Sequence, residues 1–236
     1  MKITILNGSP KGERSVTMQY VNYLEKVFPE HRFEYVHAAV KSRVYEKNRA
    51  AFDGEMEKIA SADAVLWAFP LYFLLVQSRY KRFIELIFER GRQDVFKGKY
   101  AGVLTTSIHF ADHIAHNYLR GVCDDLGMNY VDFFPAAMHD LMDADKQKSL
   151  AVFFERLLHH TERRLPAQRS TAPLIHRDFV YDSSPDALQI DTGKKVVVVA
   201  DIEQPGSSLA RMVERFRANF PESELVNLRE LKMKNC

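Results

Sequence analysis

The segment Lys2–Thr17, with the sequence KITILNGSPKGERSVT, gives the strongest single indication of the fold. Its first part, Lys2–Leu6, is apolar and β-branched, which is typical of a strand. The turn residues Asn7-Gly8-Ser9-Pro10 interrupt that strand. From Ser15 to Phe28 the apolar residues then recur at three-residue steps, as in a helix. A strand, a turn and a helix in this order favour an α/β fold with parallel strands.

The same alternation continues through the first 164 residues. Ala64–Phe69 shows no polar alternation, which indicates a strand buried on both faces, as in parallel sheets. The predicted strands span 2–6, 31–37, 64–69, 100–106 and 128–134. The predicted helices span 15–28, 50–61, 77–90, 112–126 and 144–164. We therefore predict one doubly wound domain at 1–164, with a five-stranded parallel sheet in the order 2-1-3-4-5.

Composition excludes several classes of protein. The 236 residues are 46% hydrophobic and 27% charged with a net charge of +2, which is the balance of a soluble globular protein without nucleic-acid or membrane partners. The uncharged run Ala64–Val76 contains Pro70 and is too short to cross a bilayer. With only Cys123 and Cys236, no disulfide framework is possible, and we expect a reducing, cytoplasmic location.

The remaining third of the chain has a different pattern. Residues 165–193 contain several prolines and no clear period, which indicates a linker or a wrapping arm. Residues 194–236 repeat the opening strand, Ser-containing turn, helix and strand. This partial βαβ repeat is either the start of a second such domain cut short, or a segment that docks its strands onto the first sheet.

The turn after the first strand has the composition of a phosphate site. Backbone N–H groups at a helix N-terminus favour an anion, and Ser9, Ser15 and Thr17 can donate hydroxyl hydrogen bonds. Lys11 or Arg14 can add positive charge. Neither G-x-x-x-x-G-K-[ST] nor G-x-G-x-x-G is present, so standard P-loop and dinucleotide sites are disfavoured. The alternative is a Ser-capped helix after a proline turn.

Two further loops leave the same predicted edge of the sheet. Pro70-Leu71-Tyr72-Phe73 follows the third strand at the switch point of the sheet, where ligands bind in open α/β folds. Aromatic residues beside free backbone N–H groups suit a flat heterocycle with polar edges. Residues 105–110 follow the fourth strand and would form the opposite wall.

Histidines are concentrated near this third loop. His109, His113 and His116 have a spacing that would place them on one helical face, a possible metal arrangement. No cysteine is near enough to complete a usual zinc set, so we predict no metal site. We expect His109 to line the pocket and the other two to be solvated.

These loops, together with Lys81-Arg82-Phe83-Ile84-Glu85, resemble the NADPH-dependent FMN reductase group of flavodoxin-like proteins, which includes quinone reductases and iron–sulfur flavoproteins. The resemblance covers roughly residues 1–164. It implies that the first loop binds the FMN phosphate, the second lines the isoalloxazine ring and the third closes the other side. The residues it assigns to FMN are Ser9, Lys11, Ser15, Val16, Thr17, Pro70, Leu71, Tyr72, Phe73, Thr106, Ser107 and His109.

The resemblance also implies the reaction. NAD(P)H would deliver a hydride to the flavin N5, and the electrons would pass to a quinone, a second flavin or a similar small-molecule acceptor, without a catalytic side chain. Family members often form homodimers near the flavin, and Tyr72–Val76 could serve that contact. Two alternatives are an electron carrier between protein partners and an interaction domain without a cofactor. Val16, where the family commonly has Asn, and a third loop poor in glycine favour the last alternative.

The last residue allows one more interpretation of the C-terminal repeat. Iron–sulfur flavoproteins of this group have a compact cysteine motif shortly after their second strand. Cys236 follows the second strand of the repeat, so it is either the first ligand of a cluster whose other ligands lie beyond this chain, or a plain terminal thiol.

Overall fold

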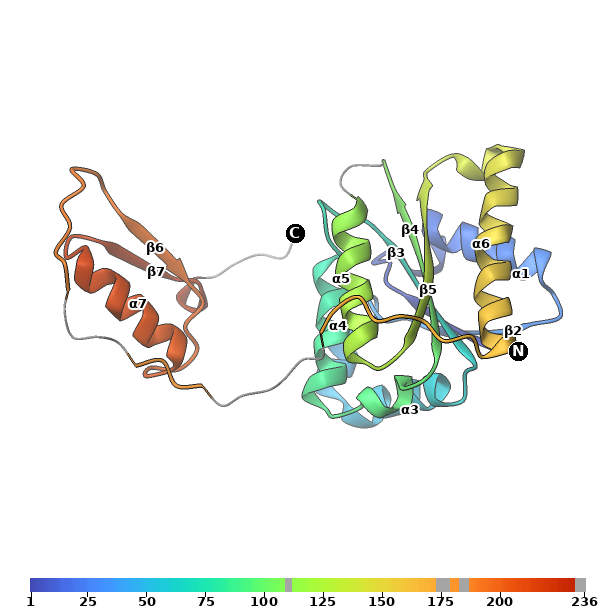
Figure 1. Cartoon of the computed structure of the whole chain (residues 1–236), viewed down its shortest axis with the longest axis horizontal. Helices are drawn as coiled ribbons and strands as arrows, with labels where there is room; N and C mark the ends of the chain where they lie inside the picture. The colour runs from blue at the N-terminus through green and yellow to red at the C-terminus, as the bar shows by residue number, and fades with distance from the viewer. Residues whose placement is uncertain (109–111, 173–178, 183–186, 232–236) are drawn as a thin grey trace. The chain divides into compact units, whose positions relative to one another are not determined.

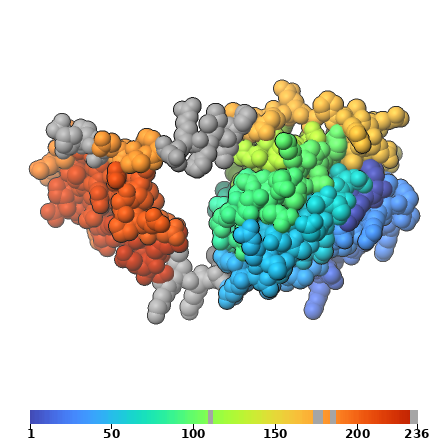
Figure 2. Space-filling model, turned by 90° about the horizontal axis from the view of Figure 1, so that it is seen from below, coloured from blue at the N-terminus to red at the C-terminus, as the bar shows by residue number. Residues whose placement is uncertain are grey.

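The computed structural model of the chain describes residues 1–108, 112–172, 179–182 and 187–231. It divides into two units, Met1–Leu174 and Ile175–Cys236, which are described separately (Figure 1). In a space-filling view, the side chains of the first unit, coloured blue to yellow, form one continuous body (Figure 2).

The first unit is built on a five-stranded parallel sheet in the order β2-β1-β3-β4-β5, which confirms the predicted fold class and strand order. Its strands are β1 (Lys2–Asn7), β2 (Arg32–Val36), β3 (Ala64–Pro70), β4 (Tyr100–Ser107) and β5 (Asn129–Ala137). β3 is central, and its register places Leu66 beside Ile5 of β1 and Gly102 of β4.

Helices cover both faces of this sheet (Figure 1). The helices of one face are α1 (Val16–Val27) and α6 (Ala144–Arg163). The helices of the other face are α2 (Ser42–Lys47), α3 (Arg49–Ala60), α4 (Ser78–Glu89) and α5 (Asp112–Asp125). Short 3-10 turns lie at Gly12–Arg14, Gln93–Phe96 and Asp140–Met142. Each face therefore has its own hydrophobic core, as a doubly wound sheet requires.

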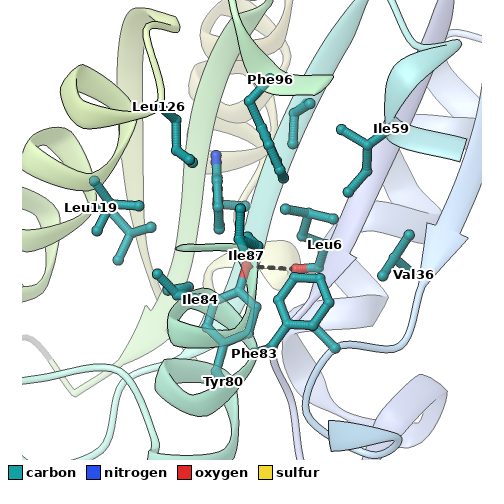
Figure 3. Close-up of a cluster of buried hydrophobic side chains, with 14 of the residues drawn as sticks. Leu6, Val36, Ile59, Tyr80, Phe83, Ile84, Ile87, Phe96, Leu119 and Leu126 are labelled. Atoms are coloured by element: carbon teal, nitrogen blue, oxygen red, sulfur yellow. Dashed lines mark hydrogen bonds between the residues drawn. The ribbon is translucent and has the colours of Figure 1, made fainter. Parts of the chain in front are cut away.

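The core on the α4 face shows how the sequence pattern becomes packing. Tyr80, Phe83, Ile84 and Ile87 recur at helical spacing along α4, and all four are buried toward the sheet (Figure 3). The Tyr80 hydroxyl donates a 2.9 Å hydrogen bond to the Leu6 carbonyl (Figure 3), so the one polar atom of that ring is satisfied inside the core.

The single tryptophan of the chain belongs to the same core. Trp67 of β3 is fully buried and stacks on Phe96, with ring centroids 5.9 Å apart and an interplanar angle of 21°. Its ring meets Tyr80 edge-on at 6.1 Å. These are the two geometries that aromatic pairs prefer, and they hold both α4 and the 3-10 turn Gln93–Phe96 against the sheet.

Several predicted boundaries differ from the structure. The strand predicted at 128–134 runs instead over Asn129–Ala137 and includes Pro135. Proline is tolerated there because β5 is at the edge of the sheet, where one side of the strand needs no hydrogen-bond donor. Helix α2 was not predicted, since its six residues are too few to establish a period.

The segment after α6 is held against the first unit by one carboxylate. Asp124, near the end of α5, accepts hydrogen bonds from the backbone N–H and the hydroxyl of both Ser170 and Thr171, at 2.8–3.1 Å. Burial alone would raise the pKa of Asp124, but the bonds from Thr171 and Ser170 outweigh burial and lower that pKa. The first part of the segment predicted as a linker or arm is therefore fixed to α5.

The second unit contains a parallel pair of strands, β6 (Val197–Ala200) and β7 (Glu224–Asn227), and one helix, α7 (Ser208–Asn219) (Figure 1). A short 3-10 turn, Leu228–Glu230, follows β7. The later part of the predicted linker contacts α7, since Phe179 O accepts from Ser208 Oγ at 3.0 Å. Cys236 lies outside the described residues, so its proposed roles stay predictions. The interpretation of the repeat as the start of a second domain also stays a prediction.

No helix within the described ranges is long and apolar enough to span a bilayer.

Gly8 gives a test of the fold. A Cβ at this position would lie 2.7 Å from Phe69 Cβ and from the Tyr80 ring, both fully buried. We expect Gly8→Ala to lower the free energy of unfolding by about 1–3 kcal/mol through overpacking, measured by urea unfolding followed by circular dichroism. Gly54→Ala is the matched control, because Gly54 is an exposed position of helix α3 with no atom within 4 Å of an added Cβ. It should stabilise the chain by about 0.5–1 kcal/mol. Equal effects of the two changes would contradict the packing argument.

Candidate functional site

Loops from four strands meet at the carboxyl edge of the first unit's sheet. They enclose a cavity of about 260 Å³. The lining residues are Ser9, Lys11, Ser15, Val16, Thr17, Pro70, Leu71, Tyr72, Thr106, Ser107, Ile108 and Met138. The cavity is therefore at the place where a parallel α/β sheet is expected to bind ligands.

The first loop is shaped by backbone and Asn7 contacts. Gly8 N donates to Ala68 O at 2.8 Å, and the Asn7 side-chain oxygen accepts from Ser9 N at 2.9 Å. Gly12 then adopts a φ of +58°, in the left-handed region that favours glycine. These contacts turn the chain tightly between β1 and α1, so that the loop lies against the sheet edge.

The hydroxyl groups of this loop keep their hydrogens for a ligand. Ser9 Oγ accepts from Lys11 N at 3.2 Å, and Ser15 Oγ, the N-cap of α1, accepts from Met18 N at 3.2 Å. In each of these bonds the serine is the acceptor, so its own O–H remains a donor. Thr17 Oγ1 and Thr106 Oγ1 are 2.6 Å apart, and since one donates to the other, the second hydrogen of the pair has no acceptor among the described residues.

The electrostatic character of the cavity is positive. The first-turn N–H groups of α1, at Val16 and Thr17, have no partner within the helix and carry the positive end of its dipole. Lys11 is exposed at the cavity rim, and no described lining residue is acidic. Hydroxyl donors, helix N–H groups and one ammonium form the donor set that binds a phosphate group in proteins.

The second loop contains a tight turn with unusual dihedral angles. Tyr72 and Leu75 exchange two backbone hydrogen bonds, at 3.1 and 3.2 Å. The central residues Phe73 and Leu74 have φ values of +29° and +73°. Left-handed conformations at residues other than glycine cost about 1–3 kcal/mol each, and they are concentrated at functional sites.

The turn also changes which backbone donors a ligand can meet. We expected free N–H groups beside the aromatic residues, but those of Tyr72 and Leu75 are paired within the turn, and Leu71 N donates to Thr106 O at 2.9 Å. The expectation is wrong for these three residues. Half-exposed Tyr72 instead offers the cavity its ring.

Phe73 lies beside the main cavity rather than in its lining. It is 84% exposed and lines a neighbouring cavity of about 210 Å³ with Leu71, Leu74, Ser107 and Ile108. Leu71, Ser107 and Ile108 line both cavities, so the two cavities share a wall.

In the third loop, Ser107 Oγ donates to both carboxylate oxygens of Asp112 at 2.8–2.9 Å, which ties the loop to the start of α5. Thr106 is buried and Ser107 half-buried at the cavity. Predicted site residue His109 lies outside the described residues.

The structure thus brings the other predicted site residues together, all in the cavity lining except Phe73. Sequence reasoning missed Met138, whereas Ile108 belongs to the wall predicted at 105–110 but was not among the residues assigned to FMN. A signal for Met138 existed, since a longer fifth strand would have carried the chain after Ala137 to the same edge.

One prediction about the histidines is wrong. His116 is only 3% exposed, whereas we expected a solvated side chain. Its Nε2 lies 2.9 Å from Thr105 Oγ1, and its ring packs on Phe133 with centroids 4.2 Å apart. The reason is its position one turn before buried Leu119 on the inner face of α5. Burial lowers the pKa of His116 to about 4. Within the described residues, no group of His, Cys, Asp and Glu could hold a metal ion.

Comparison with known proteins gives the same fold. A family model described as a flavodoxin-like fold matches residues 1–161. No curated protein matches the chain.

Solved structures match at low identity. An NADH:FMN oxidoreductase in its apo form is 21% identical with a TM-score of 0.54, covering 73% of this chain and 94% of its own. The NAD(P)H:(acceptor) oxidoreductase FerB from Paracoccus denitrificans is 17% identical with a TM-score of 0.51, covering 67% and 98%. RosB, solved with bound 8-demethyl-8-formylriboflavin-5'-phosphate, is 15% identical with a TM-score of 0.55, covering 84% and 99%.

Buried His116 predicts a pH dependence of stability. Its pKa is about 4 in the folded chain, against 6.5 for a fully solvated histidine, so between these values the unfolded chain binds more protons. The free energy of unfolding should therefore decrease as the pH falls through this window, by about 2 kcal/mol from pH 7 to pH 5. His116→Gln should remove this contribution, measured by urea unfolding at both pH values. The exposed neighbour His113→Gln controls for the loss of an imidazole from α5. If both variants show the same pH dependence, the assignment to His116 is wrong.

Proposed function

Because the chain belongs to the family with the flavodoxin-like fold, we propose that its first unit binds FMN at the carboxyl edge of the sheet and uses NAD(P)H to reduce a small-molecule acceptor. The similar solved structures support this proposal, since they include an NADH:FMN oxidoreductase, an NAD(P)H:(acceptor) oxidoreductase and a protein with a bound 8-demethyl-8-formylriboflavin-5'-phosphate.

The observation that carries the proposal is the donor set of the first loop. Ser9 and Ser15 accept backbone bonds and keep their hydroxyl hydrogens, and they lie in one cavity with the N-terminus of α1. A ligand there gains several donors and meets no carboxylate among the described lining residues, which fits a phosphate monoester better than a neutral group. In the proposal, Ser9, Lys11, Ser15, Val16 and Thr17 hold the FMN phosphate.

The second and third loops would hold the ring. Pro70, Leu71 and Tyr72 form one side, and Thr106 and Ser107 form the other, with Phe73 at the rim. The apolar and aromatic surface of these loops would exclude water from one side of a flat heterocycle, and Ser107, whose hydroxyl donates to Asp112, would line the other side. Because the turn at Tyr72–Leu75 is closed by two hydrogen bonds, this wall is preorganised before a ligand binds.

Bound FMN would supply the redox chemistry, accepting a hydride from NAD(P)H and passing electrons to the acceptor. In the proposal, the described lining side chains act by binding and orienting the ligand. Exposed Phe73 and Ile108 give the second substrate an apolar approach to the site.

The direct test is the visible spectrum of the purified full chain. We expect flavin absorption bands after incubation with FMN and desalting, and loss of these bands when NADPH or NADH is added in the absence of oxygen. An FMN-loaded chain that neither nucleotide reduces would favour an electron carrier over a reductase. A chain that retains no FMN would favour an interaction domain without a cofactor, and would refute the proposal.

The phosphate assignment has its own test. We expect the double change Ser9→Ala and Thr17→Ala to weaken FMN binding at least about 10-fold, because each lost hydrogen bond to a charged group contributes roughly 1.5–3 kcal/mol. Quenching of FMN fluorescence measures the affinity. Ser149→Ala is the control, since Ser149 is an exposed residue of α6 that bonds only within its helix. Unchanged affinity in the double variant would refute these two phosphate contacts.

A further inference from the structure

Strand β6 of the second unit has one edge without a partner. Among the described residues it pairs only with β7, in a two-stranded parallel sheet. Few side chains stabilise this sheet, since the buried apolar residues of the unit's described part are Ala200, Ala210 and Val213. Two-stranded sheets are marginally stable alone, and a parallel sheet is normally buried on both faces.

The exposure of β6 alternates residue by residue. Val198 and Ala200 are partly or fully buried, whereas Val197 is 46% and Val199 61% exposed. Side chains of a strand alternate between the two faces of a sheet, so Val197 and Val199 lie together on the face that α7 leaves open. Among the described residues of the second unit, none buries these two valines.

The unpaired N–H and C=O groups at the free edge of β6 belong to Val197 and Val199, the same two residues. Val196 O accepts from Glu224 N of β7 at 3.0 Å. Because the peptide groups of a strand point to alternate sides, Val198 and Ala200 also direct their N–H and C=O groups toward β7. Val197 and Val199 therefore direct theirs toward the free edge, where another strand can pair.

The residues flanking β6 carry opposite charges at its two ends. Lys195 precedes the valines and Asp201 follows them, and both are exposed. A strand that is positive at its start and negative at its end is complementary to a second copy of itself running in the opposite direction. The charges at the two ends of β6 thus indicate that a second copy of β6 occupies the free edge.

We propose that β6 pairs antiparallel with β6 of a second copy of the chain, so that Val197 lies opposite Val199 of the other copy. This two-fold arrangement forms a four-stranded sheet, with the edges between the copies closed by main-chain hydrogen bonds. The four exposed valines of the two copies then pack side by side on the open face.

The charged residues Lys195 and Asp201 favour this register over registers shifted along the strand. It places Lys195 opposite Asp201 of the other copy, on the same face as the valines. Lys195 already pairs with Glu224 at 2.7 Å, and Asp201 with Arg229 at 2.5 Å, so charges of alternating sign would form a row across both copies. A shift of one ladder step places Lys195 opposite Val199 in one direction and Val197 opposite Asp201 in the other, so neither shifted register keeps both Lys195–Asp201 pairs.

A cysteine cross-link tests both the contact and its register. Two full-length variants, Val197→Cys and Val199→Cys, are made in a Cys236→Ser background. The remaining Cys123 is fully buried, and burial raises the pKa of its thiol, so it does not react. Hydrogen-bonded antiparallel partners have Cα atoms about 5.5 Å apart, within the range of a disulfide, whereas identical residues in this register are roughly 8 Å apart.

Under mild oxidation we expect the equimolar mixture of the two variants to give at least about five times more covalent dimer than either variant alone. A mixture that links no better than the single variants overturns the proposal, whether the chain is then a monomer or associates through another surface such as Tyr72–Val76. Adding Asp201→Lys to both variants should reduce the yield several-fold, and adding Lys195→Glu as well should restore it. If Asp201→Lys alone leaves the yield of covalent dimer unchanged, Lys195 does not lie opposite Asp201 and the proposed register is wrong.

Discussion

Strand β3 lies between β1 and β4 and is hydrogen-bonded to both along its length. All side chains from Ala64 to Phe69 are buried, so both faces of this strand need covering helices. Parallel neighbours can be connected only by crossovers, which forces every strand of the first unit to end at one edge. The hydroxyl-rich loop after β1 and the tight turn after β3 meet for that reason. Loop residues that do not pack into the cores, unlike Gly8, can therefore change without loss of the sheet.

The sequence predicted the sheet well because its signals are long and redundant. An apolar run such as Ala64–Phe69 has few alternatives to a buried parallel strand, and the Ser15 cap marks the start of α1. The fifth strand was predicted too short because Pro135 is usually a breaker, and only its place at the sheet edge removes the penalty. His116 was misassigned because histidine spacing was considered without the neighbouring apolar residues, which determine the buried face of α5.

The candidate site was predictable in position and less so in detail. The ends of parallel strands identify the loops, so almost all predicted site residues that the structure describes line one cavity. The turn at Phe73-Leu74 was not predicted, because left-handed turns are usually marked by Asn or Gly and here are imposed by two backbone bonds. The binding roles of these residues, the domain boundaries and the location in the cell stay predictions. The segment predicted as one linker is held at Thr171 by Asp124 of α5 and at Phe179 by Ser208 of α7. Composition could not predict that its two parts contact different helices.

Trp67 gives the molecule a built-in optical probe. It is the single tryptophan in the chain, and it is stacked on Phe96 in the core of the first unit. Tryptophan emission therefore depends on the state of that core alone, while the far-ultraviolet circular dichroism signal includes α7 and the strands of the second unit. If the two signals separate during unfolding, the two units lose their structure in separate steps. One side chain in β3 thus makes the independence of the two units measurable in the unmodified protein, without labels.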